Sequence, residues 1–417
     1  MSYDICVLGL GYIGLPTASI FASKGKKVLG VDVVPAVVET INAGKIHIVE
    51  PDLDGLVRAA VRSGNLRAAD RPALAANYVI AVPTPFHQGP EGKKTPDLSF
   101  VEQATRALAA VVPAGALIIL ESTSPVGTTE KVRDWLLEEL HRTRPGEATA
   151  LGASLLFVHC PERILPGQML KELVANDRIA GGLTREAAAA AMKLYRVFCT
   201  GEIFLTDART AELAKLTENS FRDVNIAFAN ELSLICEKLR IDVWELIRLA
   251  NRHPRVKILQ PGPGVGGHCI AVDPWFIVDA APDEARLIRT AREVNDGKPA
   301  RVLDWIKRAS APFPQPVIAC LGLAFKADVD DLRESPAIGI VEALARDFSG
   351  EILAVEPHIK ALPAALAVGG RVQLTDADSA LARAQVVVLL VNHRAFKEID
   401  RRKIEGKAVI DTRGFWQ

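Results

Sequence analysis

The sequence has no excess of charge of either sign. Its 50 lysines and arginines balance 50 aspartates and glutamates over 417 residues. Surfaces that bind polyanions normally carry a basic excess, so nucleic acid is not expected as a partner. Any nucleotide site must therefore depend on local groups.

Long apolar runs are also lacking. Although 49% of the residues are hydrophobic, no window reaches the ~18 to 20 apolar residues of a membrane span. The first residues, MSYDICVLGLGYIGLP, lack the basic region, apolar segment and cleavage site of a leader peptide. We therefore expect no membrane association and a cytoplasmic location.

Paired cysteine motifs are absent. The six cysteines are far apart and contain no CxxC pair, which argues against a disulfide framework and against a structural zinc site; they are Cys6, Cys160, Cys199, Cys236, Cys269 and Cys320. Most are expected to be buried as small hydrophobic residues. We predict no metal.

Short apolar strands alternate with helical patterns in the first half and again after residue 316. Such alternation predicts parallel sheets covered on both faces. Between them, from about Asp207, the pattern indicates long helices, and the prolines of ASAPFPQP mark a boundary. We predict an α/β fold with two doubly wound Rossmann-like domains, 1–200 and 301–417, joined by a long-helix central region, 201–300.

GLGYIG places Gly9, Gly11 and Gly14 directly after an expected strand and at the start of an expected helix. This spacing is typical of a dinucleotide-binding turn, whose backbone, here including Tyr12 and Ile13, faces a pyrophosphate at the helix N-terminus. Asp32 ends the next strand and is expected to accept hydrogen bonds from ribose hydroxyls. An acid there repels a 2′-phosphate, so NAD is favoured over NADP.

Three further features carry polar groups. Thr84 and Thr123 end two expected strands, where doubly wound sheets place ligands. Lys215, Asn219 and Arg222 share a helix face at i, i+4 and i+7. In GPGVGGHCIAVDPWF, Cys269 follows a glycine-rich run and is open to interpretation as a nucleophile, a metal ligand beside His268, or a small buried residue.

The motifs together resemble the UDP-glucose/GDP-mannose dehydrogenase family over the whole chain. They occur in the family's order: GLGYIGLP, VPTP, ESTSPVGT, PER, AKLTENSFRDVNIAFANEL, GVGGHC, GLAFK and DLRESPA. CPERILPGQ, LIRLANRHPRV and QPGPGVGGHCIAVDPWFIV most resemble the branch that oxidises UDP-N-acetyl-D-mannosamine.

The resemblance implies oxidation of a sugar C6 alcohol to a carboxylate with two NAD and one water. The family's nucleophile corresponds to Cys269, which would form a thiohemiacetal and then a thioester. Its remaining catalytic residues correspond to Lys215 and Asn219 for oxyanion charge, Asp273 beside them, and Glu162 and Thr123 for the hydrolytic water.

The resemblance also implies UDP-sugar contacts. They fall on Arg163, Ile164, Lys215, Asn219, Arg222, His253, Arg255, Gly266 and Lys326, while Arg333 corresponds to an arginine that faces the cofactor. His253 and Arg255 are expected to act in their own subunit or in the partner's site of a homodimer. Gly264, Gly266 and Gly267 are expected to let the backbone approach the sugar.

Two positions depart from the UDP-glucose branch, where serine precedes the cysteine and lysine precedes the aspartate. Here they are His268 and Val272, which puts UDP-glucose in doubt. UDP-N-acetylglucosamine and UDP-glucose stay open as alternative substrates. A catalytically silent protein that binds nucleotide sugars is the alternative of another class.

Overall fold

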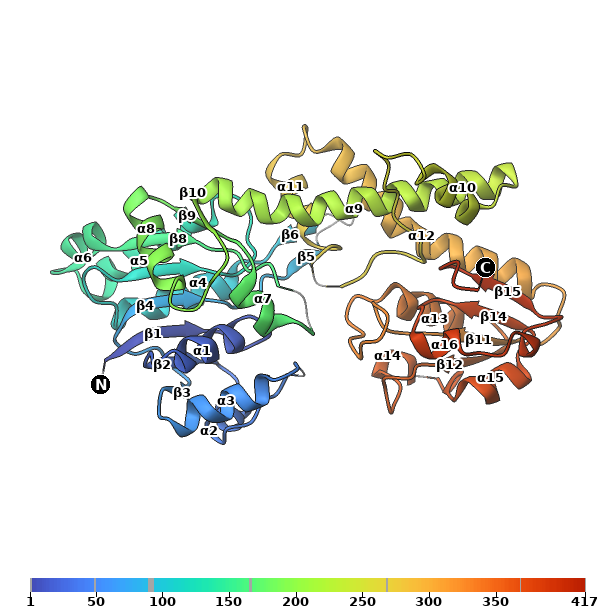
Figure 1. Ribbon diagram of the computed structural model, residues 1–417, viewed down its shortest axis with the longest axis horizontal. Helices are drawn as coiled ribbons and strands as arrows, with labels where there is room; N and C mark the ends of the chain where they lie inside the picture. The colour runs from blue at the N-terminus through green and yellow to red at the C-terminus, as the bar shows by residue number, and fades with distance from the viewer. Residues whose placement is uncertain are drawn as a thin grey trace. The chain divides into compact units, whose positions relative to one another are not determined.

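The computed structural model describes residues 2–48, 50–88, 94–164, 167–267, 269–367 and 369–416. The chain forms two compact units, Met1–Thr217 and Glu218–Gln417, each built on a twisted sheet (Figure 1). None of the helices in these described ranges is both long and apolar enough to cross a membrane.

The first unit contains an eight-stranded sheet in the order β10-β9-β8-β7-β4-β1-β2-β3. Its pairings are parallel except that between β8 and β9. Runs such as LIIL are buried along their whole length because helices cover both faces. The strands are β1 (Tyr3–Leu8), β2 (Val28–Val31), β3 (Leu66–Ala69), β4 (Ala75–Ile80), β7 (Leu117–Leu120), β8 (Leu156–His159), β9 (Arg178–Gly182) and β10 (Ile203–Asp207).

Helices and a small hairpin complete this unit. The hairpin of β5 (Phe86–Gln88) and β6 (Lys94–Pro96) is an element that the sequence patterns did not predict. The helices are α1 (Gly14–Ser23), α2 (Pro35–Asn42), α3 (Leu53–Arg62), α4 (Ser99–Ala107), the 3-10 turn η2 (Leu108–Ala110), α5 (Thr128–Thr143), α6 (Ala148–Ser154), α7 (Met169–Ala175) and α8 (Arg185–Tyr195).

The second unit contains a five-stranded parallel sheet in the order β13-β12-β11-β14-β15. This repeats the order β3-β2-β1-β4-β7 of the first sheet, so the prediction of two doubly wound domains is confirmed. Its elements are α10 (Val243–Ala250), α11 (Asp273–Ala280), α12 (Arg286–Ser310), β11 (Val317–Leu321), α13 (Pro336–Asp347), β12 (Glu351–Val355), α14 (Ala364–Ala367), β13 (Val372–Leu374), α15 (Ala377–Arg383), β14 (Val386–Leu389), α16 (Arg394–Lys397), the 3-10 turn η3 (Arg401–Lys403) and β15 (Ala408–Asp411).

The long central helix is α9 (Ala208–Leu239), and the boundary between the units falls inside it. At its start, Asp207 Oδ1 accepts a hydrogen bond from Thr210 N at 2.9 Å, as a helix cap does. It ends at Arg240, which has a left-handed φ of 59°, and Ile241 N then donates to Cys236 O. This termination satisfies carbonyls at the helix end.

Candidate active site

The glycine-rich turn between β1 and α1 has the geometry of a pyrophosphate site. Gly9 has a φ of +89°, and a Cβ on Gly14 would lie 1.8 Å from Gly9 O. These two glycines are therefore required by the turn itself. A Cβ on Gly11, by contrast, would meet no described atom within 4 Å, so the backbone at Gly11 is open to a ligand.

Asp32 lies at the end of β2 and is joined to this turn. Its Oδ2 accepts a hydrogen bond from Leu10 N at 3.0 Å, and its Oδ1 accepts one from Val34 N at 3.0 Å. The side chain is half-buried. The carboxylate is thus held at the edge of the glycine-rich turn, where a dinucleotide ribose binds in this kind of fold.

Thr84 and Thr123 follow the neighbouring strands β4 and β7. Thr84 Oγ1 donates a hydrogen bond to Thr123 O at 2.6 Å. This hydrogen bond joins the ends of the two strands.

Glu162 follows β8 and is almost fully buried, at 8% exposure. Its Oε2 accepts a hydrogen bond from Arg178 Nη2 at 2.8 Å, and its Oε1 accepts one from Arg163 N at 2.8 Å. Arg178 is itself buried and lies over the ring of Tyr195 at 4.6 Å. A fixed, paired carboxylate of this kind is well oriented to act on a water.

Sequence reasoning missed Arg178. It is the one charged residue of β9, RIAGG, and a charge inside a short buried strand is the signal that could have found it. Of the other predicted residues nearby, Arg163 donates to the backbone oxygen of Asp177, and Ile164 packs against the apolar core of the first unit.

Lys215 lies in the first unit, half-buried on α9. It is close enough to His159, at the end of β8, for its charge to act on that ring. Burial, more than the charge of Lys215, lowers the pKa of His159 to about 3. His159 is therefore neutral at physiological pH.

In the second unit, Cys269 lies in a turn that leads into α11. Cys269 O accepts hydrogen bonds from Val272 N and Asp273 N. Cys269 is exposed, whereas the other five cysteines are buried, as predicted for most of them. His268, the other residue of the metal interpretation, lies outside the described residues.

Asn219 and Asp273 form a buried pair beside this turn. Asn219 Nδ2 donates to Asp273 Oδ2 at 2.5 Å, and the two residues are 7% and 3% exposed. The pair joins α9 to the start of α11. Asn219 and Asp273 are 54 positions apart in the chain. The sequence analysis assigned both to one site, and the structure shows them in contact.

The glycines before Cys269 make room for the protein's own loops. A Cβ on Gly266 would lie 2.3 Å from Glu334 O, and one on Gly267 would lie 3.0 Å from the ring of Phe325. The same holds for Gly264, where a Cβ would come within 2.9 Å of Pro336. These contacts explain the glycines by packing, a reason that differs from the expected approach of a sugar.

These contacts bring the GLAFK and DLRES segments to the cysteine loop. Lys326 is exposed beside Phe325. Arg333 is exposed as well, and its guanidinium donates two hydrogen bonds to Asp331, at 2.8 and 2.6 Å. Both predicted cations of the C-terminal half therefore lie on segments that border the cysteine loop.

The other predicted cations are exposed. Arg222 lies on α9, while His253 and Arg255 lie in the segment after α10, where Arg255 N donates to His253 Nδ1 at 3.3 Å.

Arg413 is a half-buried cation that sequence reasoning missed. A Cβ on Gly262, at the start of the cysteine loop, would lie 2.5 Å from Arg413 Nη1. Arg413 Nε donates to Leu390 O, and burial lowers the pKa of its guanidinium to about 10. Its position in DTRG, directly after a strand, was the available signal.

Comparison with known proteins gives a consistent assignment over the whole chain. Residues 3–199 match the NAD binding domain of the UDP-glucose/GDP-mannose dehydrogenase family, residues 209–297 its central domain, and residues 319–417 its UDP binding domain. The chain belongs to this family. It is an NAD-dependent nucleotide-sugar dehydrogenase, as the resemblance implied.

Relatives of this dehydrogenase carry two kinds of name. An NDP-N-acetyl-D-galactosaminuronic acid dehydrogenase of Ralstonia nicotianae is 59% identical over 99% of this chain and 96% of its own. The UDP-N-acetyl-D-mannosamine dehydrogenase of Escherichia coli K12 is 55% identical over 99% of both chains. The solved structure of the UDP-D-ManNAc dehydrogenase of Pyrococcus horikoshii has a TM-score of 0.87 at 40% identity, covering 100% of this chain and 96% of that one.

In the UDP-binding domain of this dehydrogenase, the acid at the end of the second strand is covered. Glu356, at the end of β12, corresponds to Asp32. Like Asp32, it accepts hydrogen bonds from the turn after the first strand of its sheet, here from Leu323 N and Ala324 N after β11. It is only 5% exposed, and His393 Nε2 lies 3.0 Å from its Oε2. His393 therefore covers this carboxylate, whereas Asp32 is half-buried.

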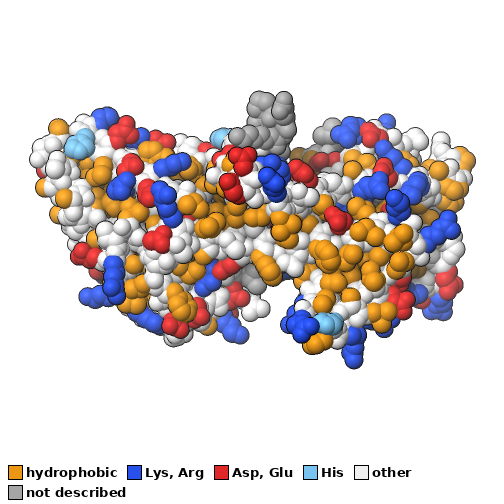
Figure 2. All heavy atoms as spheres, turned by 90° about the horizontal axis from the view of Figure 1, so that it is seen from above, with side chains coloured by type: hydrophobic (Ala, Val, Ile, Leu, Met, Phe, Trp, Pro, Cys, Tyr) orange, Lys and Arg blue, Asp and Glu red, His pale blue; other side chains and the backbone are white. Residues whose placement is uncertain are grey.

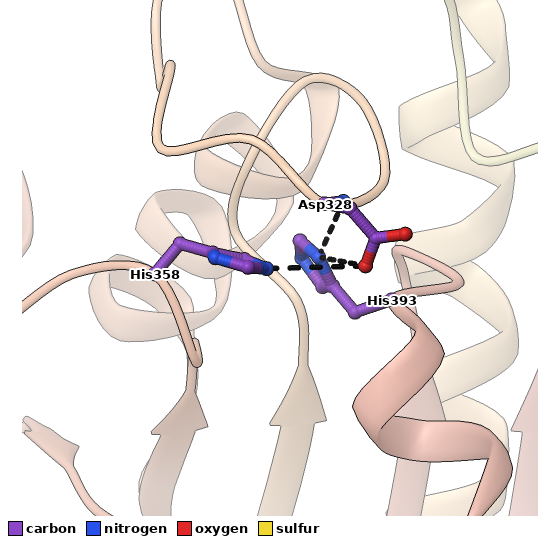
Figure 3. A group of neighbouring side chains, drawn as sticks. All are labelled: Asp328, His358 and His393. Atoms are coloured by element: carbon purple, nitrogen blue, oxygen red, sulfur yellow. Dashed lines mark hydrogen bonds and ion pairs between the residues drawn. The ribbon is translucent and has the colours of Figure 1, made fainter. Parts of the chain in front are cut away.

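His393 also belongs to a group with Asp328 and His358 whose potential metal-ligand atoms lie within 4.8 Å of one another (Figure 3). Asp328 N donates to His393 Nδ1 at 2.9 Å, and Nε2 is engaged by Glu356. Both ring nitrogens of His393 are thus used inside the protein. These hydrogen bonds explain why the three side chains lie together better than a metal site does.

Proposed function

We propose that this dehydrogenase oxidises C6 of UDP-N-acetyl-D-mannosamine to the carboxylate, UDP-N-acetyl-D-mannosaminuronate, with two NAD and one water. The observation that carries the proposal is the exposed Cys269 beside the buried Asn219 and Asp273 pair. The names of the relatives from Escherichia coli and Pyrococcus horikoshii support the mannosamine substrate.

Cofactor binding is assigned to the first glycine-rich turn. The open space at Gly11 and the oriented carboxylate of Asp32 fit a dinucleotide. Thr84 and Thr123 are proposed to line the same edge of the sheet, and Arg333 is proposed as a further cofactor contact. When bound at this turn, NAD would supply the hydride acceptor for each of the two oxidations.

The first oxidation converts the C6 alcohol to an aldehyde. The hydroxyl loses its proton as the C6 hydride leaves, so negative charge develops on the C6 oxygen. Lys215 and Asn219 lie one turn apart on α9 and are proposed to stabilise that charge. Asp273 orients the Asn219 amide by accepting its N–H.

The second oxidation requires a covalent intermediate. The Cys269 thiolate adds to the aldehyde carbon and the oxygen takes a proton, which gives a thiohemiacetal; this adduct then loses its hydroxyl proton together with the C6 hydride to give a thioester. Water then attacks the thioester, the C–S bond breaks and the thiolate leaves. We propose that Glu162 removes the proton of this water and that Thr123 helps to hold it.

The phosphates of the UDP moiety require cationic side chains and backbone groups that can approach closely. Lys326, Arg163, Arg222, His253, Arg255 and the Gly266 backbone are proposed to contact it, with Ile164 beside the sugar. We add Arg413, because the guanidinium of this half-buried residue lies against Gly262 at the start of the cysteine loop. Arginine can bind a phosphate through two donors at once.

We propose a homodimer that uses α9. Phe221, Phe228 and Ile235 recur every seven residues along one face of this helix and are 68%, 54% and 44% exposed. Hydrophobic side chains also gather over this part of the molecule in Figure 2. An exposed apolar stripe of this kind is typical of a protein interface.

The domain roles and the location are proposed as follows. Residues 1–200 bind NAD, 201–300 carry the cysteine loop and the dimer interface, and 301–417 bind the UDP-sugar, which the ranges of the three family domains support. The free cysteines fit a reducing compartment, the cytoplasm.

A second candidate substrate is the N-acetylgalactosamine nucleotide. The relative from Ralstonia nicotianae, at 59% identity, supports it. Both candidates carry an acetamido group at C2 and differ in sugar configuration. UDP-N-acetylglucosamine and UDP-glucose are the further alternatives, and a catalytically silent sensor is the alternative of another class.

The test is to follow NADH with UDP-N-acetylmannosamine, UDP-N-acetylgalactosamine, UDP-N-acetylglucosamine and UDP-glucose under identical conditions. The proposal predicts the highest kcat/KM for the mannosamine nucleotide. A higher value for the galactosamine nucleotide would favour the second candidate. Tight binding without NADH from any of the four would favour the sensor.

A further inference from the structure

The loop that carries Cys269 is held by α9 at both ends. At its far end, Asn219 donates to Asp273. At its near end, Asn230 Oδ1 accepts a hydrogen bond from Gly262 N at 2.8 Å. The two asparagines are eleven residues apart, which is about three helical turns, so they share one face of α9.

Asn230 belongs to a buried polar ladder between α9 and α12. Asn230 Nδ2 donates to Asn295 Oδ1 at 2.8 Å, and Asn295 Nδ2 donates to Asp223 Oδ1 at 2.8 Å. Arg292 Nη1 donates to the same carboxylate oxygen at 2.6 Å. These four residues are at most 1% exposed, so the ladder is shielded from water.

The hydrogen bonds of this ladder can be arranged with only one orientation of the two amide groups. The ionised carboxylate of Asp223, paired with Arg292, can only accept hydrogen bonds, so Asn295 must turn its NH2 group toward it. Asn295 then presents its oxygen to the NH2 group of Asn230. The oxygen of Asn230 is consequently left to face Gly262 N.

This orientation matters because the loop has little side-chain bulk of its own. Gly264, Gly266 and Gly267 follow Gly262, and glycines leave a backbone with wide conformational freedom. A fixed acceptor at the first residue restricts where such a loop begins. The packing of α9 against α12 needs Asn230 and Asn295 but does not need a bond to the loop.

We propose that Asn230 is a positioning residue that sets where the cysteine loop begins and thereby where Cys269 Sγ lies. Asn295, Asp223 and Arg292 fix the orientation of its amide. The inference rests on the proposed role of Cys269 as nucleophile. It adds a residue that itself need not touch substrate or cofactor.

The first experiment compares the wild type with Asn230→Ala. Alkylation of Cys269 by iodoacetamide is followed in the folded protein by mass spectrometry of the peptide that contains Cys269, and turnover is measured in parallel. We expect a several-fold change in alkylation rate, kcat lower by about 10–100-fold and an unchanged KM for NAD.

Asn42→Ala is the matched control. Asn42 also bridges two elements through both ends of its amide, with Ala68 N and Ala68 O at 2.9 Å, but it lies in the first unit. Because Asn42 is exposed whereas Asn230 is buried, Asn42→Ala should lose less stability than Asn230→Ala, and it should leave the alkylation rate unchanged. If Asn230→Ala and Asn42→Ala alkylate and turn over alike, the proposal is wrong.

Two conservative variants keep the test decisive. Asn230→Gln retains both an acceptor for Gly262 N and a donor for Asn295 Oδ1, with one added methylene, and should keep more of the wild-type alkylation rate than Asn230→Ala; a loss as large as that of Asn230→Ala would overturn the proposal. Asn230→Ser retains a polar group but is too short to reach Gly262. If Asn230→Ala does not fold, wild-type alkylation in Asn230→Ser would overturn the proposal.

The alkylation readout separates this inference from the proposed function. It reports the position of the Cys269 thiol whether or not that thiol takes part in catalysis. If Cys269→Ser retains normal turnover, the proposed function fails. A changed alkylation rate in Asn230→Ala would still support the positioning of the loop.

Discussion

At the scale of single residues, different glycines of the chain are required for different physical reasons. A Cβ on Gly14 would collide with the backbone of Gly9, at 1.8 Å, whereas a Cβ on Gly11 would meet open space. Gly14 is therefore required by the fold. Gly11 is required only if a ligand approaches the backbone there.

This contrast gives a prediction for two variants. Gly14→Ala should lower the free energy of unfolding by about 1–3 kcal/mol, because the turn is overpacked. Gly11→Ala should leave the melting temperature unchanged and raise KM for NAD about tenfold, since its methyl group would occupy the pyrophosphate space. Thermal unfolding and steady-state kinetics measure both. Equal thermal destabilisation by the two substitutions would contradict this account.

The role of a residue could be predicted from the sequence only where it belongs to a recurrent motif or where the residues it contacts are close in the chain. The turn of Gly9, Gly11 and Gly14 with Asp32 was predicted because the motif is local. The pairing of Glu162 with Arg178, and of Gly262 with Asn230, joins residues from different elements. No local pattern specifies such a contact.

At the scale of elements, α9 presents two opposite faces. Asn219, Asp223 and Asn230 lie on the buried face, while Phe221 and Phe228 lie on the exposed one. The helical period of 3.6 residues separates the two sets. One helix therefore offers a polar face to the cysteine loop and to α12, and an exposed apolar face that we propose contacts a second copy of the chain.

Phe228→Glu tests the apolar face of α9. A charge in the middle of the stripe should dissociate the proposed homodimer, because burying an unpaired carboxylate is costly. Light scattering after size-exclusion chromatography measures the mass. Leu74→Glu is the control: Leu74 is similarly exposed, at 47%, but precedes β4 in the first unit and is not part of the α9 stripe. A Phe228→Glu protein with an unchanged dimeric mass would refute the proposed interface.

The sequence predicted this helix and the spacing of Lys215 and Asn219. It could not predict that Asn219 would be paired with Asp273 or that the glycines near Cys269 accommodate Phe325, Glu334 and Pro336. Those partners lie more than 50 positions away in the chain. Helical periodicity defines a face but not what covers it.

At the scale of the whole molecule, two sheets of the same strand order have different nucleotide chemistry. Each has an acid at the end of its second strand, Asp32 or Glu356, and this parallel was predictable from the sequence. The difference between the two acids was not predictable, because Glu356 is covered by His393, which follows β14 and lies 37 positions away in the chain. Covering one acid leaves a single open dinucleotide turn among the described residues.

The central claim is that Cys269 forms the covalent intermediate of the second oxidation. The most direct measurement is the number of NADH released per nucleotide sugar, by the wild type and by Cys269→Ser, with limiting substrate. The account predicts about two for the wild type. For Cys269→Ser it predicts about one, with an aldehyde or a slowly hydrolysed ester remaining. Release of about two NADH at the wild-type rate by Cys269→Ser would contradict the account.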